Sequence, residues 1–422
     1  MADFAIGAFS LTSSTGNQAT TGVGFQPSCV LHFGCQASVG TQSSRFAFGA
    51  ASSSSARFAG DIVDRDSQAN METRSSFDTA DFLSACSLTA DSVGQQADFV
   101  SMDSDGFTVN NKIAAAYAAG KYVAFNSATI SAFVGKFTMN SGTGNQSVSG
   151  IGFKPKVVIF YTNIKNTTEG AVPDAVMSMG VAVSSTKRWC QATFCVDAAA
   201  NSDTARYFDD TKCFAQISAS AVTGAADFVS MDNDGFTINV TTGLACEIGY
   251  IALGGNALSA STGTFVQKTT TGNQAYTGVG FSPQLLMVMG LANAKATVEG
   301  GAIGMLGFGM SSSSRAYTNY RSNDGAGSST SSRIGNTNLI IGDNSAATPG
   351  TVLNAADVVS MDTDGFTLNW STTDGTAREW GYLALRIAGN VIPVNGSMDH
   401  SVAAPGLTLP VSIIPVLSLI HI

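Results

Sequence analysis

Three Asp-x-Asp-Gly segments are the part of this sequence whose residue types and spacing come closest to a metal site. Each lies in a stretch that reads Ser-Met-Asp-x-Asp-Gly-Phe-Thr, at residues 101–108, 230–237 and 360–367. Carboxylates at this spacing bind calcium in EF-hand loops, which also need an earlier ligand and a glutamate near the end. Here serine occupies the earlier position and no glutamate follows. We expect hairpin turns whose aspartates bond the local backbone, with calcium binding as the alternative. The aspartates are Asp103, Asp105, Asp232, Asp234, Asp362 and Asp364.

Catalytic chemistry has little support in the residue pattern. A nucleophilic serine, cysteine or threonine needs a nearby base, but the repeats share no histidine position and the chain has no Gly-x-Ser-x-Gly elbow. Glycosidase chemistry needs paired carboxylates. The further aspartates that recur, Asp98, Asp227 and Asp357, fit surface or turn caps. The sequence therefore predicts a non-enzyme without catalytic, cofactor-binding or metal-binding residues.

Two other polar features have a structural and a functional interpretation. His32 lies inside the apolar run at residues 28–35, which favours a hydrogen-bonded core or interface histidine over a functional one. Asn17-Gln18 recurs as Asn145-Gln146 and Asn273-Gln274. We interpret these pairs as a structural amide network, with a sugar site as the alternative.

The cysteines indicate reduced thiols. Their number is odd, none lies in the third repeat, and no position carries cysteine in all three repeats. A disulfide framework would recur with the repeating unit, so we expect free thiols in apolar strands. The seven are Cys29, Cys35, Cys86, Cys190, Cys195, Cys213 and Cys246.

The elements that would position these residues are short strands and tight turns. Each Asp-Gly pair is a hairpin-turn signal, and the flanking residues alternate between apolar and polar. A Thr-Gly-Asn-Gln segment followed by Gly-x-Gly-Phe opens each repeat, and a Tyr-x-Ala-(Phe/Leu) strand closes it. Residues 113–119 are the best helical candidate, but they are few and show no amphipathic pattern.

The spacing of these signatures defines a tandem triplication. Asn17, Asn145 and Asn273 recur every 128 residues. This period is that of a whole domain and far exceeds the roughly 20–50 residues of a solenoid unit. We therefore predict an all-β chain with three homologous antiparallel β-sandwich domains, jelly-roll-like, at residues 1–128, 129–257 and 258–389.

Four further segments have a predicted place. The polar stretches at residues 61–78, 197–212 and 319–333 are interpreted as long loops that make contacts or carry function. Beyond the repeats, residues 390–422 hold four prolines with apolar residues between them. They predict an extended C-terminal arm that docks on a neighbouring domain or subunit.

Composition limits the classes of partner. The chain has 422 residues, 44% of them hydrophobic, and only 12% are charged, about half the usual share. The formal net charge is −9, and no lysine or arginine run exists. These values argue against nucleic acid or an anionic membrane as a partner. The N-terminal residues do not read as a secretory signal, so we expect the protein to be made in a cytoplasm.

The combined motifs resemble a β-module in structural genes of tailed bacteriophages. The resemblance covers residues 7 to about 388; the third repeat fits best, at residues 365–370 and 382–385, and the first departs most, at residues 110–113. It implies a virion component but does not fix which one. The expected partners are capsid or tail subunits and further copies of the chain, and the expected location is the virion.

Two functions from different classes follow. The first is a non-enzymatic virion structural protein, such as a capsid decoration or another head or tail accessory component, that assembles through β surfaces of low charge. The alternative is an adhesin of a tail or head fibre that binds a receptor or host-surface glycan, where three weak sites would gain by avidity.

Overall fold

A computed structural model of the chain describes residues 2–34, 40–90, 92–115 and 117–389. The chain divides into two units, Met1–Ala388 and Gly389–Ile422. The predicted C-terminal arm lies outside the described residues, as do Cys35, His400 and His421.

The described residues form strands and contain no helix, which confirms the all-β prediction. The helical candidate at residues 113–119 falls instead at the end of β10 and the start of β11. The first repeat holds β1 (Phe4–Leu11), β2 (Gly16–Thr21), β3 (Pro27–Gly34), β4 (Thr41–Gln42), β5 (Ser44–Ala51), β6 (Arg57–Asp64), β7 (Thr73–Asp78), β8 (Leu83–Cys86), β9 (Val93–Asp103), β10 (Gly106–Ile113) and β11 (Tyr117–Asn126).

The other two repeats follow the same order of strands. The second holds β12 (Ser131–Thr138), β13 (Gly144–Ser149), β14 (Val157–Thr162), β15 (Gly170–Pro173), β16 (Ala175–Ala182), β17 (Arg188–Cys195), β18 (Thr204–Asp209), β19 (Phe214–Ile217), β20 (Val222–Asp232), β21 (Gly235–Thr242) and β22 (Glu247–Gly254). The third holds β23 (Leu258–Val266), β24 (Gly272–Thr277), β25 (Leu285–Ala292), β26 (Glu299–Gly300), β27 (Ala302–Ser311), β28 (Ser314–Ser322), β29 (Ser331–Asn336), β30 (Ile341–Asn344), β31 (Val352–Asp362), β32 (Gly365–Thr372) and β33 (Glu379–Ile387).

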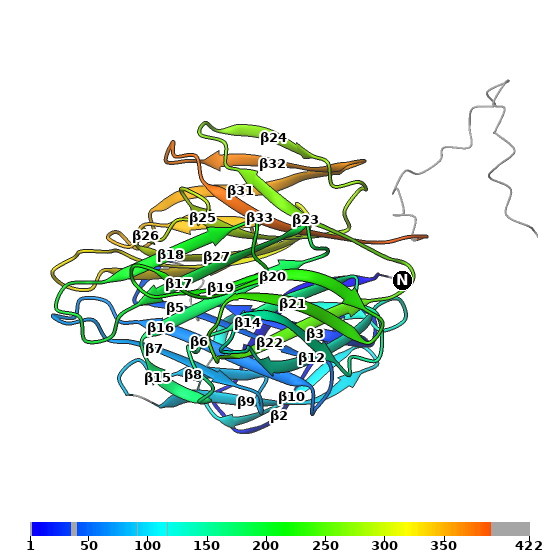
Figure 1. Ribbon diagram of the computed structural model, residues 1–422, viewed down its shortest axis with the longest axis horizontal. Coiled ribbons are helices and arrows are strands. Elements are labelled where there is room, and N and C mark those ends of the chain that lie inside the picture. Colours follow the sequence, from blue (N-terminus) through cyan, green and yellow to red (C-terminus); the bar gives the residue numbers. More distant parts are fainter. Residues whose placement is uncertain (1, 35–39, 91, 116, 390–422) are drawn as a thin grey trace, which may run out of the picture. The chain divides into compact units, whose positions relative to one another are not determined.

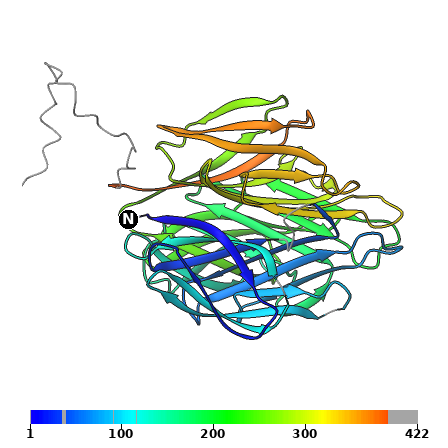
Figure 2. The same cartoon turned by 180° about the vertical axis from the view of Figure 1, so that it is seen from behind.

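These strands pair into six antiparallel sheets, a seven-strand and a four-strand sheet for each repeat. The four-strand sheets have the orders β2-β10-β9-β8, β13-β21-β20-β19 and β24-β32-β31-β30. In Figure 1, β24, β32 and β31 lie at the top of the molecule and β2, β9 and β10 at the bottom; Figure 2 shows the same arrangement from behind.

Each seven-strand sheet takes its last strand from a different repeat. The orders are β1-β11-β3-β5-β6-β7-β15, β12-β22-β14-β16-β17-β18-β26 and β23-β33-β25-β27-β28-β29-β4. The second repeat thus lends β15 to the first, the third lends β26 to the second, and the first lends β4 to the third. Because every repeat both lends and accepts a strand, the exchange closes into a ring.

Buried apolar side chains fill both faces of the seven-strand sheets. One face packs against the four-strand sheet of the same repeat; in the first repeat this layer includes Phe9, Phe82 and Phe107. The other face contributes to one core shared by all three repeats, with Phe33, Met177 and Leu306 among its residues. Burial on both faces explains why β5, β16 and β25 are buried along their whole length.

The prediction of long polar loops was wrong for part of their length. The segments at residues 61–78, 197–212 and 319–333 contain β7, β18, parts of β6, β28 and β29. Polar side chains of these strands, such as Ser75, are buried and hydrogen-bond to neighbouring chain segments; the Ser75 hydroxyl donates to the Asp174 carbonyl at 2.8 Å. In these strands, polar residues therefore indicate contacts between repeats and not exposure to solvent.

The hairpins form where they were predicted, but one residue earlier. Asp103 pairs with Gly106, so Ser104 and Asp105 are the two turn residues and Gly106 begins the next strand. A Cβ atom at Gly106 would lie 1.9 Å from the Thr20 carbonyl oxygen of β2. The glycine is therefore required by the close approach of the neighbouring strand.

Candidate functional site

The hairpin of each repeat holds the Gly-x-Gly bend that precedes the first buried strand. In the first repeat, the Asp105 carboxylate accepts hydrogen bonds from the amides of Gly22, at 3.1 Å, and Gly24, at 2.6 Å. The amide of Val23, between them, donates to the Asp105 carbonyl at 3.3 Å. Gly22 and Gly24 have φ angles of +82° and +87°, which favour glycine. We call this arrangement the aspartate clamp.

The clamp has the same geometry in the other two repeats. Asp234 accepts from Gly150 and Gly152, and Asp364 from Gly278 and Gly280, again at 3.1 and 2.6 Å. The aspartates thus bond backbone about 80 residues away rather than the local backbone that the sequence indicated.

The first aspartate of each pair is bonded within its own hairpin. Asp103 accepts hydrogen bonds of 2.7 Å from the Ser101 and Thr108 hydroxyls, and Asp232 and Asp362 repeat this pattern. Both aspartates of each pair therefore carry protein donors on both carboxylate oxygens. Within the described residues, no group of three or more candidate ligands could hold a metal ion.

The recurring glutamines act on the backbone of the strand before them. The Gln146 side chain accepts from the Asn140 amide at 2.9 Å and donates to the Thr138 carbonyl at 2.7 Å. Gln18 makes the same pair of bonds to Thr12 and Ser10. The neighbouring asparagines lie opposite an asparagine of the next strand in each repeat, and in the third repeat the Asn369 side chain donates to that of Asn273 at 2.6 Å. This geometry fits the structural interpretation of the amide network.

The recurring aspartates before the hairpins are ion-paired with the arginine of a serine-rich turn. Arg315 lies 2.8 Å from Asp357, Arg188 lies 3.6 Å from Asp227, and Arg57 lies 3.2 Å from Asp98. These pairs were not predicted from the sequence. Both partners recur in every repeat at a separation of about 40 residues, and that separation is the signal that reveals them.

His32 and the six cysteines that the structure describes are buried. The His32 ring packs edge-on against Phe82, with the ring centroids 4.9 Å apart, and burial lowers its pKa to about 3. The six described cysteines are free and buried. Burial raises the pKa of Cys86 and of Cys246 to about 12, so neither thiol forms the reactive thiolate at neutral pH.

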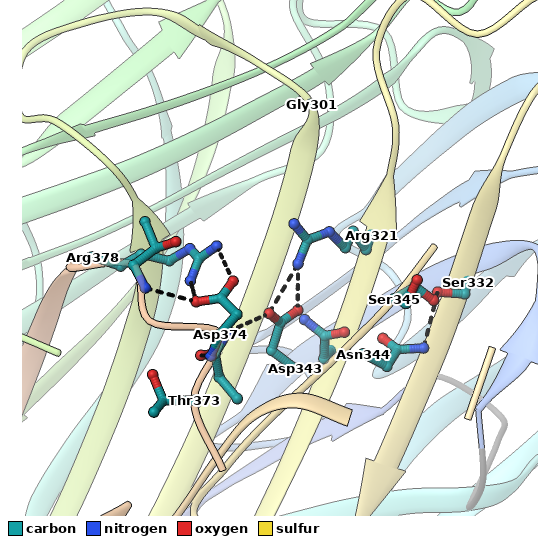
Figure 3. Close-up of polar contacts among 12 residues, drawn as sticks. Gly301, Arg321, Ser332, Asp343, Asn344, Ser345, Thr373, Asp374 and Arg378 are labelled. Atoms are coloured by element: carbon teal, nitrogen blue, oxygen red, sulfur yellow. Dashed lines mark hydrogen bonds and ion pairs between the residues drawn. The ribbon is translucent and has the colours of Figure 1, made fainter. Parts of the chain in front are cut away.

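An ion-pair network distinguishes the third repeat (Figure 3). Arg321 of β28 points toward Asp343 of β30, and its guanidinium lies 2.9 Å from the carboxylate. The Arg378 guanidinium donates to the Asp374 carboxylate at 2.6 Å. Burial opposes ionisation of Asp374, but the hydrogen bonds from Arg378 lower the pKa of this carboxyl below its usual value. Asn354 of β31 links the two pairs, because it donates to Asp343 at 2.9 Å and accepts from the Asp374 amide at 3.1 Å.

The predicted contact-making loops meet one another in three reciprocal backbone pairs. Met71 and residues 198–199 join the first two repeats, Ser202 and residues 325–326 join the second and third, and Ser329 and residues 67–68 join the third and first. Each pair has one hydrogen bond in each direction, of 2.7–3.0 Å. We call this closed set the loop triangle.

One buried carboxyl lies at the boundary between the first and third repeats. Asp64 accepts a hydrogen bond from the Ser322 hydroxyl, and its backbone carbonyl accepts from the Ser331 hydroxyl at 2.8 Å. Burial raises the pKa of Asp64 from 3.8 to about 7, and the charge of Asp66 acts in the same direction. The folded state therefore favours the protonated form of this carboxyl.

Side chains from the second and third repeats line an open groove of about 670 Å³. Its polar residues include Lys154, Lys156 and Lys187, and its apolar wall includes Val279 and Phe281. The groove contains no aspartate or glutamate among its lining residues. It is called the lysine groove below.

The described residues include no helix long and apolar enough to cross a membrane. Neither a scan against protein-family models nor a search of curated proteins finds a match to this chain.

Proposed function

We propose that this chain is a non-enzymatic structural protein of a bacteriophage virion, serving as a capsid decoration or another head or tail accessory component. In this proposal, residues 1–128, 129–257 and 258–389 are three jelly-roll-like β-sandwich domains. Residues 390–422 are an arm that docks on a neighbouring subunit.

The closed strand exchange is the observation that carries the proposal. Three related repeats in cyclic order give one chain the surface of a trimer, with three similar faces. Such a body suits a position of local threefold symmetry, because each face can meet an equivalent neighbour. The low charged fraction supports burial of these faces against other proteins.

The test is the composition of purified particles. We expect the chain to remain with virions through density-gradient purification, in a fixed copy number that mass spectrometry measures. Its loss during purification, with free chain remaining as a stable monomer, would contradict the proposal.

A glycan-binding adhesin is the second candidate, and the lysine groove is the observation that favours it. Exposed tryptophans would support sugar binding, but Trp189, Trp370 and Trp380 are fully buried. Binding to a glycan array that is lost on mutation of the groove would move the assignment to host recognition.

A further inference from the structure

Three lysines for which the described residues provide no acidic partner lie together in the lysine groove. All 21 lysines and arginines lie in the described part of the chain. Five of them have no acidic group within 4.0 Å among the described residues: Lys154, Lys156, Lys187, Lys268 and Arg386. Three of these five line the groove. The clustering is unusual for a chain whose formal net charge is −9.

The three lysines belong to the second repeat alone. The motif alignment places Gln26, Ser28 and Ala56 at the matching positions of the first repeat, and Ser282, Gln284 and Ser314 in the third. The fold common to the repeats therefore forms without these charges. The three lysines are exposed, so an anionic ligand has access to all of them and would supply the negative charge that the groove lining lacks.

The groove also offers hydroxyl groups and an apolar wall. Ser184, Ser185 and Ser259 line it beside the lysines, and Phe281 contributes to its wall. Its volume is within the range of about 300–1,000 Å³ that small-ligand sites occupy. A second cavity of about 420 Å³ shares Lys154 and Lys156, so these side chains line both hollows.

A peptide is a less suitable occupant, because side chains of the second repeat lie over the strand edge beside the groove. β23 is an edge strand, and strand addition would need its free backbone. Lys187 Nζ donates to the Ser261 hydroxyl at 3.3 Å, and the Trp189 ring nitrogen donates to the Thr262 hydroxyl at 2.9 Å. Both contacts come from the second repeat and cover this edge.

We propose that the lysine groove binds an acidic saccharide, a sugar chain that carries carboxylate, sulfate or phosphate groups. The lysines pair with the anionic groups, the serine hydroxyls bond the sugar hydroxyls, and Val279 and Phe281 pack against the sugar rings. The inference does not rest on the virion proposal, since a saccharide could bind this groove in any setting.

Calorimetric titration of the full chain tests the proposal with defined probes. Tetragalacturonate supplies carboxylates, a heparin tetrasaccharide supplies sulfates, and maltotetraose is the neutral control. We expect at least one acidic probe to bind about tenfold more tightly than maltotetraose, with affinity that falls between about 50 and 300 mM salt. Equal binding of acidic and neutral probes, or no binding of either acidic probe, would overturn the proposal.

The matched variant carries the residues of the first repeat, K154Q/K156S/K187A. We expect it to lose at least about tenfold in affinity. K268Q removes a lysine that has no acidic partner among the described residues and lies outside the groove lining, so this variant should keep full affinity. K187A alone should weaken binding by a smaller factor and serves if the triple variant is unstable. Unchanged affinity in the lysine variants would refute the site, and tighter binding of hexaglutamate than of both acidic sugars would assign the groove to peptides.

Discussion

Each repeat uses an aspartate to fix a glycine bend, and this contact links two motifs that the sequence shows as separate. Asp234 provides both carboxylate oxygens to Gly150 and Gly152, although the three residues lie in different parts of the repeat. The Asp-x-Asp-Gly pattern resembles a calcium loop because both uses require carboxylate oxygens directed by a tight turn. The contact between the aspartate and the glycine bend has no local sequence signal. It could be predicted only from the fact that the Asp-x-Asp-Gly and Gly-x-Gly motifs recur together in every repeat.

Removal of one clamp should destabilise the protein. We expect Asp234→Ala to lower the free energy of unfolding by about 2 kcal/mol, because two backbone amides lose a charged acceptor. Chemical denaturation measures this change. Asn233→Ala, at the exposed neighbouring turn residue, should change it by less than about 0.5 kcal/mol. Equal effects of the two substitutions would mean that the clamp contributes nothing beyond the turn.

Asp64 should make stability depend on pH. Its pKa is raised in the folded state, so its contribution is fully present below about pH 4 and is lost as pH rises through about 7. We expect the free energy of unfolding to fall across this interval by up to about 1.4 kcal/mol per pH unit for this group. Denaturation at a series of pH values measures the slope.

Two variants isolate the Asp64 contribution from that of other groups. Asp64→Asn resembles the protonated form and should remove part of the slope. Ser322→Ala removes a hydrogen bond that lowers the pKa, so it should move the loss of stability to higher pH. A pH profile that is the same in Asp64→Asn and the parent protein would show that this carboxyl does not titrate in the range.

At the scale of elements, an aromatic side chain of one repeat packs on a glycine in the last strand of the next. Trp189 of β17 lies against Gly381 of β33, and Phe58 of β6 lies against Gly249 of β22. The motif alignment places Ala316 and Lys121 at the matching positions of the third interface. At two boundaries a large aromatic side chain therefore faces a glycine. At the third boundary the corresponding residues are an alanine and a lysine, so the three interfaces differ in side-chain size.

This match predicts coupling between Trp189 and Gly381. A Cβ atom at Gly381 would lie 2.3 Å from the indole ring, so Gly381→Ala should destabilise the protein by about 2 kcal/mol or more. Trp189→Ala should lower the free energy of unfolding by about 3–5 kcal/mol through the cavity it leaves. The double variant should be less destabilised than the sum of the two changes. Gly142→Ala, with open space around the glycine, is the control; full additivity would contradict the coupling.

Sequence patterns predicted the strands and hairpins better than the partners of these elements. Alternation and Asp-Gly turns are local signals, and they located β9 and β10 with their counterparts. β4, β15 and β26 are two to four residues long and pair with another repeat, so no local pattern marks them. The polar strands were misinterpreted as loops because their buried side chains bond other segments, which polarity alone does not reveal.

At the scale of the molecule, three sets of contacts join all three repeats. The exchanged strands, the loop triangle and the shared core each involve every repeat. The period of 128 residues predicted three units, but it could not distinguish a rod from a ring. The ring depends on which strand edges of different repeats pair with each other, and tertiary packing determines that pairing.

The ring should unfold as one cooperative unit. A single repeat would expose its part of the shared core, so we expect no stable intermediate with one repeat unfolded. Differential scanning calorimetry of the full chain should give one transition whose calorimetric and van't Hoff enthalpies agree. Three transitions, or a calorimetric enthalpy about threefold larger than the van't Hoff value, would mean that the repeats unfold independently.

The most direct test of the account is cryo-electron microscopy of the virion that contains this chain, at a resolution that separates strands. The account predicts one chain at each occupied site, with its three repeats in a ring and β4, β15 and β26 each pairing within the same chain. Its three faces should meet capsid or tail neighbours. Density for an extended row of separate repeats, or particles without the chain, would contradict it.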